Sequence, residues 1–200
     1  MAFIGMRHVV GAKLSAHTEG SEPTYVSGGK DLGGAISANL TINRANNPLY
    51  YDDAVGEEDN GINSIDIELG LDDLDEEIQE FMGLLEKKTA GTPAVTTYYE
   101  TDGASDYIGF GYMRVRRRKG VTTYQGIWFY KVMFSRGTES AATKGESIEW
   151  QTPTVTGRSI PLNVDSDGER KYRKIRNFSG ASGETDCASW LDSLAGITRT

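Results

Sequence analysis

The feature that most constrains this chain is an alternation of apolar and polar side chains with a period of two. In residues 34–43 the even positions, such as Leu40, are apolar, and the odd positions, such as Asn39, are polar. Residues 64–70 repeat the alternation. Because successive side chains of a β-strand point to opposite faces of a sheet, both segments predict strands with one buried face and one polar face.

The same period recurs through most of the 200 residues and predicts a mainly β domain of the α+β class. Residues 107–116 and 122–135 predict a hairpin that turns at Lys119 and Gly120. The second arm of this hairpin is apolar on both faces, which indicates a central strand. Further strands are expected at residues 7–15, 95–100, 146–156, 159–164 and 171–177. No linker or internal repeat divides the chain, so we expect a single domain over residues 1–200.

Two segments break this period and predict helices. Residues 72–87 carry apolar side chains at helical spacing, with Asp72 as the expected N-cap and with Lys87 and Lys88 at the other end. Residues 184–195 place apolar side chains on one face, and a glycine follows the last turn. We therefore expect one main helix and one short C-terminal helix beside the strands.

The connection over residues 44–62 is long for a link between two neighbouring strands. Hairpin loops commonly have about two to five residues. This connection is instead rich in Asn, Tyr and carboxylates over its whole length. Since such a loop is costly to order alone, the sequence predicts that it is functional or that it is an arm that binds a partner.

Charge is unevenly distributed along the chain. The formal net charge is -8, but residues 1–100 carry 6 basic and 18 acidic side chains, whereas residues 101–200 carry 15 basic and 11 acidic ones. A net acidic chain repels phosphate at range, which excludes a general nucleic-acid binder. A chain with two oppositely charged halves is instead suited to associate with copies of itself.

The charged residues also form clusters. From Asp52 to Glu86 there are fourteen acidic residues and no basic one. Two basic runs lie in the second half of the chain: Arg114, Arg116, Arg117, Arg118 and Lys119, then Arg170, Lys171, Arg173, Lys174 and Arg176. Each run is either a solvated surface or a patch that docks on the acidic region of a neighbouring copy in a head-to-tail contact. The sequence leaves open which run would meet the acidic region.

Residues that carry chemistry are sparse. His8 and His17 have no cysteine or carboxylate at ligand spacing, and Cys187 lies on the apolar face of a predicted helix. Residues 165–168 begin like a calcium loop, but Arg176 stands where that loop needs a glutamate, so a β-turn is expected. We therefore predict no catalytic residue, no cofactor and no metal site.

One enzymatic alternative is a glycosidase that uses Glu146 and Glu149 as paired carboxylates. These two positions have opposite parity on a strand and would face opposite sides, so surface charges are the favoured interpretation. The single cysteine allows no disulfide within the chain. No secretory signal and no apolar run of the ~20 residues that span a bilayer is apparent, so no membrane anchor is expected.

Several motifs follow one another in a recognisable order. They are Gly5-Met-Arg-His-Val-Val-Gly-Ala-Lys-Leu, Leu40-Thr-Ile-Asn43, Asn47-Pro-Leu-Tyr-Tyr-Asp-Asp53, Glu57-Glu-Asp-Asn60, Ile65-Asp-Ile-Glu-Leu-Gly-Leu-Asp-Asp-Leu74, Met82-Gly-Leu-Leu85, Trp150-Gln-Thr-Pro153 and Ala188-Ser-Trp-Leu-Asp192. Together they resemble the major tail protein family, the tail tube subunits of long-tailed, non-contractile bacteriophages. The stretch from Asn47 to Asp53 is the most specific of these motifs.

The resemblance implies a tail-tube fold, in which a β-sandwich or partial barrel with a flanking helix completes a β-barrel shared by several subunits. It also implies hexameric rings stacked into a hollow tube, through which DNA passes transiently without specific binding. By parity, the residues expected to line the channel are Ser37, Asn39, Thr41, Ser64, Asp66, Glu68, Glu149 and Gln151. An acidic or neutral lining lets DNA slide, because phosphate finds few cations there. The alternative is an ordinary sheet that faces solvent.

The long loop is expected to stack the rings. Its candidate contact residues are Asn47, Pro48, Tyr50, Tyr51, Asp52, Asp53, Glu57, Glu58 and Asp59. The resemblance implies as partners further copies of the chain and the tape measure, tail terminator and distal tail proteins. It implies assembly in the host bacterial cytoplasm and a final location in the virion. The alternatives are another tail or baseplate β-sandwich module and the carbohydrate-active enzyme above.

Overall fold

One large antiparallel sheet forms the body of the molecule. The computed structural model describes residues 2–45, 47–51, 54–59, 61–100, 105–136 and 152–199, with the backbone alone for residues 2, 47–51 and 54–59. The strands of this sheet are β1 (Ala2–Ala16), β2 (Thr24–Tyr25), β3 (Lys30–Asp31), β4 (Ala35–Arg44), β7 (Ile62–Leu71), β10 (Tyr107–Arg118), β11 (Val121–Arg136), β12 (Thr154–Ser159) and β15 (Arg173–Ser179). They pair in the order β2-β1-β10-β11-β12-β7-β4, with β15 also beside β11 and β3 beside β1.

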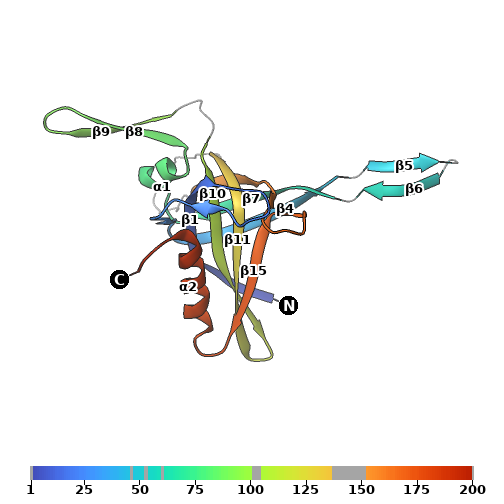
Figure 1. The fold of residues 1–200 in the computed structure, drawn as a ribbon. Coiled ribbons are helices and arrows are strands. Elements are labelled where there is room, and N and C mark those ends of the chain that lie inside the picture. The colour runs from blue at the N-terminus through green and yellow to red at the C-terminus, as the bar shows by residue number, and fades with distance from the viewer. Residues whose placement is uncertain are drawn as a thin grey trace, which may run out of the picture.

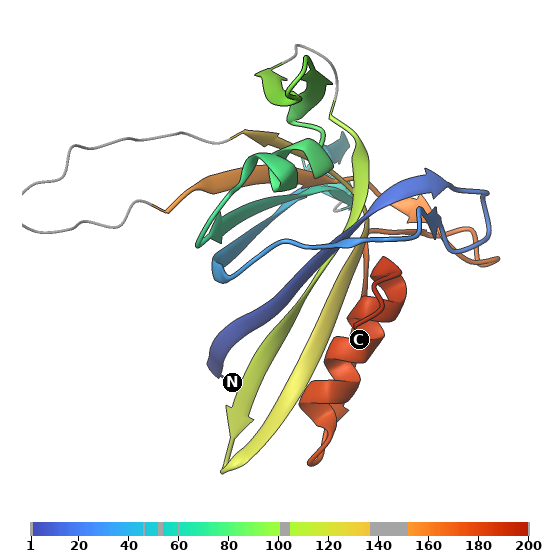
Figure 2. The same cartoon turned by 90° about the vertical axis from the view of Figure 1, so that its left-hand side faces the viewer.

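The long strand β11 divides this sheet into two parts. Its residues 123–129 pair with β15, and its residues 132–136 pair with β12. We call β1, β10, β15 and the first half of β11 the lower sheet, and we call β12, β7, β4 and the end of β11 the upper sheet. Figure 2 shows that the two sheets run at a steep angle to each other, so they enclose a wedge. The prediction that β11 is a central strand is confirmed.

The main hydrophobic core fills this wedge. From the upper sheet, β7 contributes Ile65, Ile67 and Leu69, which are all buried as their alternation predicts. From the lower sheet, β10 and β11 contribute residues such as Phe110 and Phe129, whose ring centroids lie 6.2 Å apart. Burial of these large side chains is the main stabilising term of the fold.

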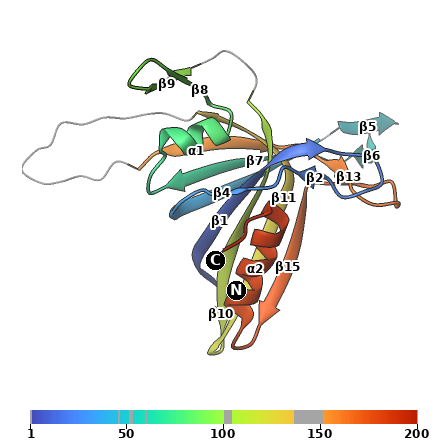
Figure 3. The same cartoon turned by 60° about the vertical axis from the view of Figure 1, so that its left-hand side comes forward.

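A second core lies on the other face of the lower sheet, beneath the helix α2 (Gly183–Ala195) (Figure 3). Cys187 and Leu191 of this helix are fully buried. The helix sits close to the sheet because β11 has Gly126, where a Cβ atom would lie 2.6 Å from a ring carbon of Trp190. The predicted C-terminal helix is confirmed, and Gly196 ends it with a φ of 67°.

The predicted helix over residues 72–87 is wrong in its extent. The helix α1 spans only Glu76–Phe81, and Asp75 caps it by accepting a hydrogen bond from the backbone N–H of Ile78. Gly83 then turns the chain with a φ of 74°, and the strand β8 (Leu85–Ala90) follows. Lys87 and Lys88 therefore belong to a strand and do not close the helix.

The predicted loop over residues 44–62 is replaced by a β-hairpin. Strands β5 (Asn47–Tyr51) and β6 (Ala54–Asp59) pair in an antiparallel manner and extend away from the body, which continues the line of β4 and β7 (Figure 1). We call this hairpin the acidic arm. A second hairpin, formed by β8 and β9 (Val95–Glu100), extends on the opposite side of the body. The sequence analysis predicted β9 but not its partner.

The remaining predictions hold in part. The hairpin of β10 and β11 is confirmed, and Lys119 and Gly120 form its turn with positive φ angles of 47° and 80°. The segment predicted at residues 159–164 is reduced to β13 (Leu162–Asn163), which pairs with β14 (Arg170–Lys171) around the predicted turn. The start of the strand predicted at residues 146–156 lies outside the described residues. Neither α1 nor α2 is long and apolar enough to cross a membrane, in the part of the chain that the structure describes.

Candidate functional site

The upper sheet presents one polar face, opposite to the face that β7 buries in the main core. Hydrogen-bonded register places Asn39 of β4 directly opposite Glu68 of β7, and Thr41 opposite Asp66. Ser37 and Ser64 follow the same alternation at the two ends of this pairing. All six residues that parity assigned to a common face within β4 and β7 therefore lie on one face, but Ser64 is buried, with 3% of its surface exposed, and so is not a surface residue as predicted.

The strands β12 and β11 extend this polar face to four strands. Thr156 pairs with Glu68 on one side and with Ser135 on the other. Arg158 likewise pairs with Asp66 and with Met133. The sequence analysis missed these residues, although the alternation of Thr154, Thr156 and Arg158 with Val155 and Gly157 was a signal that could have found them.

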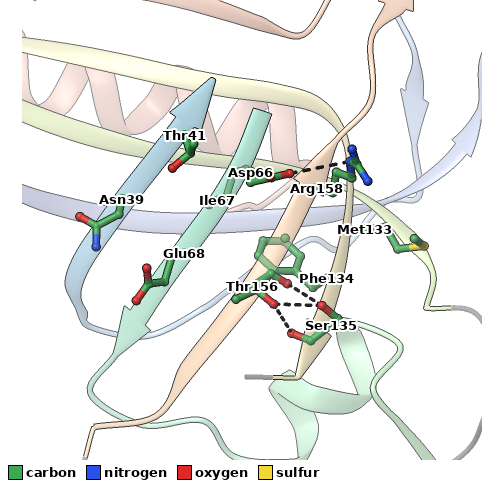
Figure 4. Close-up of a pocket in the computed structure, with 11 residues that line it drawn as sticks. Asn39, Thr41, Asp66, Ile67, Glu68, Met133, Phe134, Ser135, Thr156 and Arg158 are labelled. Atoms are coloured by element: carbon green, nitrogen blue, oxygen red, sulfur yellow. Dashed lines mark hydrogen bonds and ion pairs between the residues drawn. The ribbon is translucent and has the colours of Figure 1, made fainter. Parts of the chain in front are cut away.

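These residues line a shallow groove of about 480 Å³ on the polar face (Figure 4). The hydroxyl groups of Ser135 and Thr156 lie 3.0 Å apart and form a hydrogen bond across β11 and β12. Asn43 Nδ2 donates to Asp66 Oδ2 at 2.6 Å and lies 3.1 Å from Ser64 Oγ. The face is therefore tied together by short polar side chains that satisfy one another.

The charge of the groove is close to balanced. Arg158 Nε lies 3.7 Å from Asp66 Oδ1, and its guanidinium also donates to Ser64 Oγ at 3.2 Å. Both ionic side chains are about half exposed or more, so water screens this pair. Glu68 remains exposed beside it. The groove thus carries two carboxylates and one guanidinium among its described residues, which is a slightly acidic surface with one cation that sequence reasoning did not foresee.

Other predicted site residues are placed only in part. Glu149 and Gln151 lie outside the described residues, as do Asp52 and Asp53. The other candidates for ring stacking lie in the acidic arm: Asn47, Pro48, Tyr50 and Tyr51 in β5, and Glu57, Glu58 and Asp59 in β6. The arm is separate from the polar groove and continues outward from the end of the same two strands, β4 and β7 (Figure 1).

The two basic runs are divided by the fold. Arg114, Arg116 and Arg118 of β10 alternate onto the face of the lower sheet that points toward the wedge, and Arg173 of β15 lies on the same face, stacked over Phe129. Arg117 and Lys174 point to the opposite face by parity, and Lys119 lies in the hairpin turn. The structure therefore brings parts of both basic runs onto one surface.

Several of the remaining basic residues already have acidic partners within the chain. Lys174 pairs with Glu22, and Lys171 of β14, next to Arg170, lies between Asp165 and Asp167. Hydrogen bonds from Asp165 and Lys171 lower the pKa of Asp167 to about 2. These contacts stabilise the turn before β14. The two aspartates of the calcium-like loop therefore form ion pairs with Lys171.

The two histidines of the chain contact groups that lie far from them in the sequence. His8 Nε2 lies 2.8 Å from Asp192 Oδ1, and His17 Nε2 lies 2.9 Å from the carbonyl oxygen of Asn163. No group of three or more His, Cys, Asp or Glu side chains is arranged to hold a metal ion in the described ranges. Glu146 and Glu149, the carboxylates of the glycosidase alternative, lie outside these ranges.

In comparisons with known proteins, no family model matches this chain, and no curated protein matches its sequence. The functional interpretation therefore depends on the geometry of the polar face, the two projecting hairpins and the distribution of charge.

Proposed function

We propose that the chain is a structural subunit that assembles with copies of itself into a hollow tube, as the resemblance to phage major tail proteins implies. In this assembly the polar face of the upper sheet lines a water-filled channel. Rings of subunits, with six copies expected in each, stack along the channel axis. DNA passes through the channel without specific binding, and the chain catalyses no reaction.

The observation that carries the proposal is the polar face itself. Three of its four strands bury residues of their other face in the main core, and β4 packs Ala38 and Leu40 against that core, yet none of the described elements covers the polar side. The side chains that it displays are short hydroxyls and amides with a small excess of negative charge. Such a surface offers phosphate few cations with which to replace its counterions, so DNA would slide past it.

The edges of the upper sheet support assembly between copies. Within the described residues β4 pairs with β7 alone, so its other edge has free backbone groups, and it carries Ile36 and Ile42 with 54% and 42% of their surfaces exposed. At the other edge, pairing of β10 with β11 ends at Tyr107 and Met133, so within the described strands Phe134 and Ser135 pair only with β12. Open strand edges favour pairing with another chain, and closure into a barrel removes them.

Electron microscopy of the purified protein over a range of concentrations tests the proposal. We expect hollow tubes with a regular axial repeat. A protein that stays monomeric at every concentration would contradict the proposal. Single closed rings that never stack would instead favour another tail or baseplate module, which shares the β-sandwich and the projecting hairpins but has a different assembly.

A further inference from the structure

The lower sheet has an uncovered basic face at the end remote from the upper sheet. On this face the buried positions Tyr112 and Ile127 give way to Arg114, Arg116 and Arg118 along β10. The apolar side chains of Phe3 and Val121 share this face and have 47% and 61% of their surfaces exposed. We call this surface, made of Phe3, Arg114, Arg116, Arg118, Val121 and Arg173, the arginine face. A hollow of about 420 Å³ lies at its end, between the tip of the β10–β11 hairpin and the last residues of β15.

Among the described residues, Arg114 has neutral partners and no carboxylate beside it. Its guanidinium lies 4.2 Å from the centre of the Phe3 ring, and it donates to Gln125 Oε1 at 2.8 Å. Gln125 in turn donates to Asn177 at 2.9 Å, which fixes the arginine on this side of the sheet. Its Nε atom is buried without a hydrogen bond, and burial lowers the pKa of the side chain. A partly desolvated cation of this kind is stabilised by a carboxylate.

No such carboxylate is supplied by the described part of the same copy. Arg114, Arg118 and Arg173 form no ion pair there, and the arginine face carries no acidic residue. Two of the carboxylates around α1 have partners of their own: Asp75 caps the helix and Glu77 pairs with Lys30. We therefore consider a second copy of the chain as the source of this counter-charge.

The acidic arm has the matching charge. Its strand β6 contains Glu57, Glu58 and Asp59, and its two strands contain no basic residue. An isolated two-stranded hairpin is only marginally stable in water, so a projecting arm of this kind gains most from a surface on which to lie. In Figure 1 the arm extends sideways from the upper sheet, whereas the β10–β11 tip points downward. The arm and the tip of the lower sheet therefore extend in different directions from the body of the same copy.

We propose that the arginine face is the docking site for the acidic arm of a second copy, whose carboxylates pair with Arg114 and Arg118. The inference rests on the proposed function, because it requires that copies of the chain assemble. The contact is heterologous, since the arm of one copy meets a different surface of the next, and such contacts repeat without limit unless they close into a ring. This docking site answers which basic run meets the acidic region: it is the first run, together with Arg173 of the second.

Charge reversal in two separate variants tests this contact. Arg114→Glu/Arg118→Glu reverses the face, and Glu57→Lys/Glu58→Lys reverses the arm. We expect each variant alone to associate at least about tenfold more weakly than the unmodified chain, as sedimentation velocity at low salt measures. An equal mixture of the two should recover association, because each altered surface then finds an opposite charge on the other variant.

Two further variants keep the test interpretable. Lys87→Glu/Lys88→Glu makes the same change in charge on β8 and should associate like the unmodified chain. Because Arg114 is partly buried, Arg118→Glu/Arg173→Glu provides a second face variant, and circular dichroism reports whether each variant folds. Folded face variants that associate normally would overturn the inference, as would a mixture that fails to recover.

Electron microscopy of the same samples separates this inference from the proposed function. Tubes that form equally well from the unmodified chain and from the face variants would leave the proposed function standing and overturn the docking site. Charge-dependent particles other than tubes would support the docking site and contradict the tube. A third outcome is that the unmodified chain binds short duplex DNA and that the face variants lose this binding but associate normally. That outcome would identify a nucleic-acid surface and overturn the inference.

Discussion

At the scale of single residues, Cys187 makes the stability of the fold depend on pH. Its side chain is fully buried between α2, to which it belongs, and the lower sheet, and burial raises the pKa of its thiol to about 12. The pKa of an exposed thiol is about 8.5, so the unfolded chain loses this proton at lower pH than the folded chain does. The resulting stabilisation is complete below about pH 8.5 and is lost as the pH rises toward 12.

We therefore expect the free energy of unfolding to fall between pH 8.5 and 9.5 by up to about 1.4 kcal/mol per pH unit through this group. Urea unfolding at several pH values measures the slope. Cys187→Ala serves as the control: it lowers stability at every pH because it leaves a small cavity, but it lacks the slope that the thiol contributes. An identical slope in both proteins would contradict the assignment.

The partner of His8 shows what sequence spacing misses at this scale. His8 was predicted to have no metal-ligand partner nearby in the sequence, and its actual partner, Asp192, lies on α2, almost at the other end of the chain. Arg199 donates to the same carboxylate at 2.8 Å and to Asp31 at 2.9 Å. Contacts of this kind depend on how distant elements pack, so no local pattern of residues could have predicted them.

At the scale of elements, sequence patterns succeeded where one face of an element is buried and failed where neither face is. The alternation in β7 and the apolar stripe of α2 both follow a clear contrast in burial, and the bounds of these elements were predicted nearly to the residue. The bounds of β4 were predicted as closely, but Ile36 and Ile42 of its apolar face are exposed. In β8 five of six residues are exposed, so no alternation marks it as a strand. The apolar residues before β8 mimicked a longer helix, but Gly83 turns the chain where a Cβ atom would lie 2.5 Å from the backbone nitrogen of Asp106.

The packing of α2 on the lower sheet gives a prediction about glycine. At Gly126 a Cβ atom would lie 2.6 Å from a ring carbon of Trp190, and that ring also packs against Phe178 at a centroid distance of 5.9 Å. We expect Gly126→Ala to destabilise the fold by about 1–3 kcal/mol, because the helix must move away from the sheet. Urea unfolding measures the change. Gly5→Ala, also in a strand but with nothing within 4 Å of its Cβ position, should change stability little.

The acidic arm gives a second prediction for an element. The pairing of β4 with β7 continues to Arg44 and Ile62, and Ala45 N donates to Gly61 O at 2.8 Å. Replacing residues 46–60 by Asn-Gly should therefore close the hairpin with a tight turn and leave the body folded. We expect this variant to keep the circular dichroism spectrum of the body and to lose tube growth in electron micrographs. Tubes of normal length from the shortened chain would show that the arm has no part in assembly.

At the scale of the whole molecule, the polar face could be predicted only for two of its four strands. Parity found the residues of β4 and β7, because apolar and polar side chains alternate in the sequence of both strands. It missed Ser135 and Arg158, since β11 is apolar on both sides for most of its length and only its end crosses into the upper sheet. The arginine face could not be predicted from the sequence either. Alternating arginines on a strand do not show which side of the strand another sheet covers, or where that covering sheet ends.

The charge of the polar face gives the last prediction, which concerns the assembled tube. Thr41 and Glu68 are exposed on this face, and Thr41 lies opposite Asp66. Thr41→Lys/Glu68→Lys therefore adds three positive charges to each copy without burying any of them. Copies repeat around the channel, so the added cations would form rings that release counterions from DNA. We expect tubes of this variant to retain short duplex DNA in co-sedimentation at low salt, and to release it as salt increases. Thr89→Lys/Glu86→Lys makes the same change on β8, away from the channel, and its tubes should retain much less DNA. Equal retention by the two variants would mean that the polar face does not line the channel.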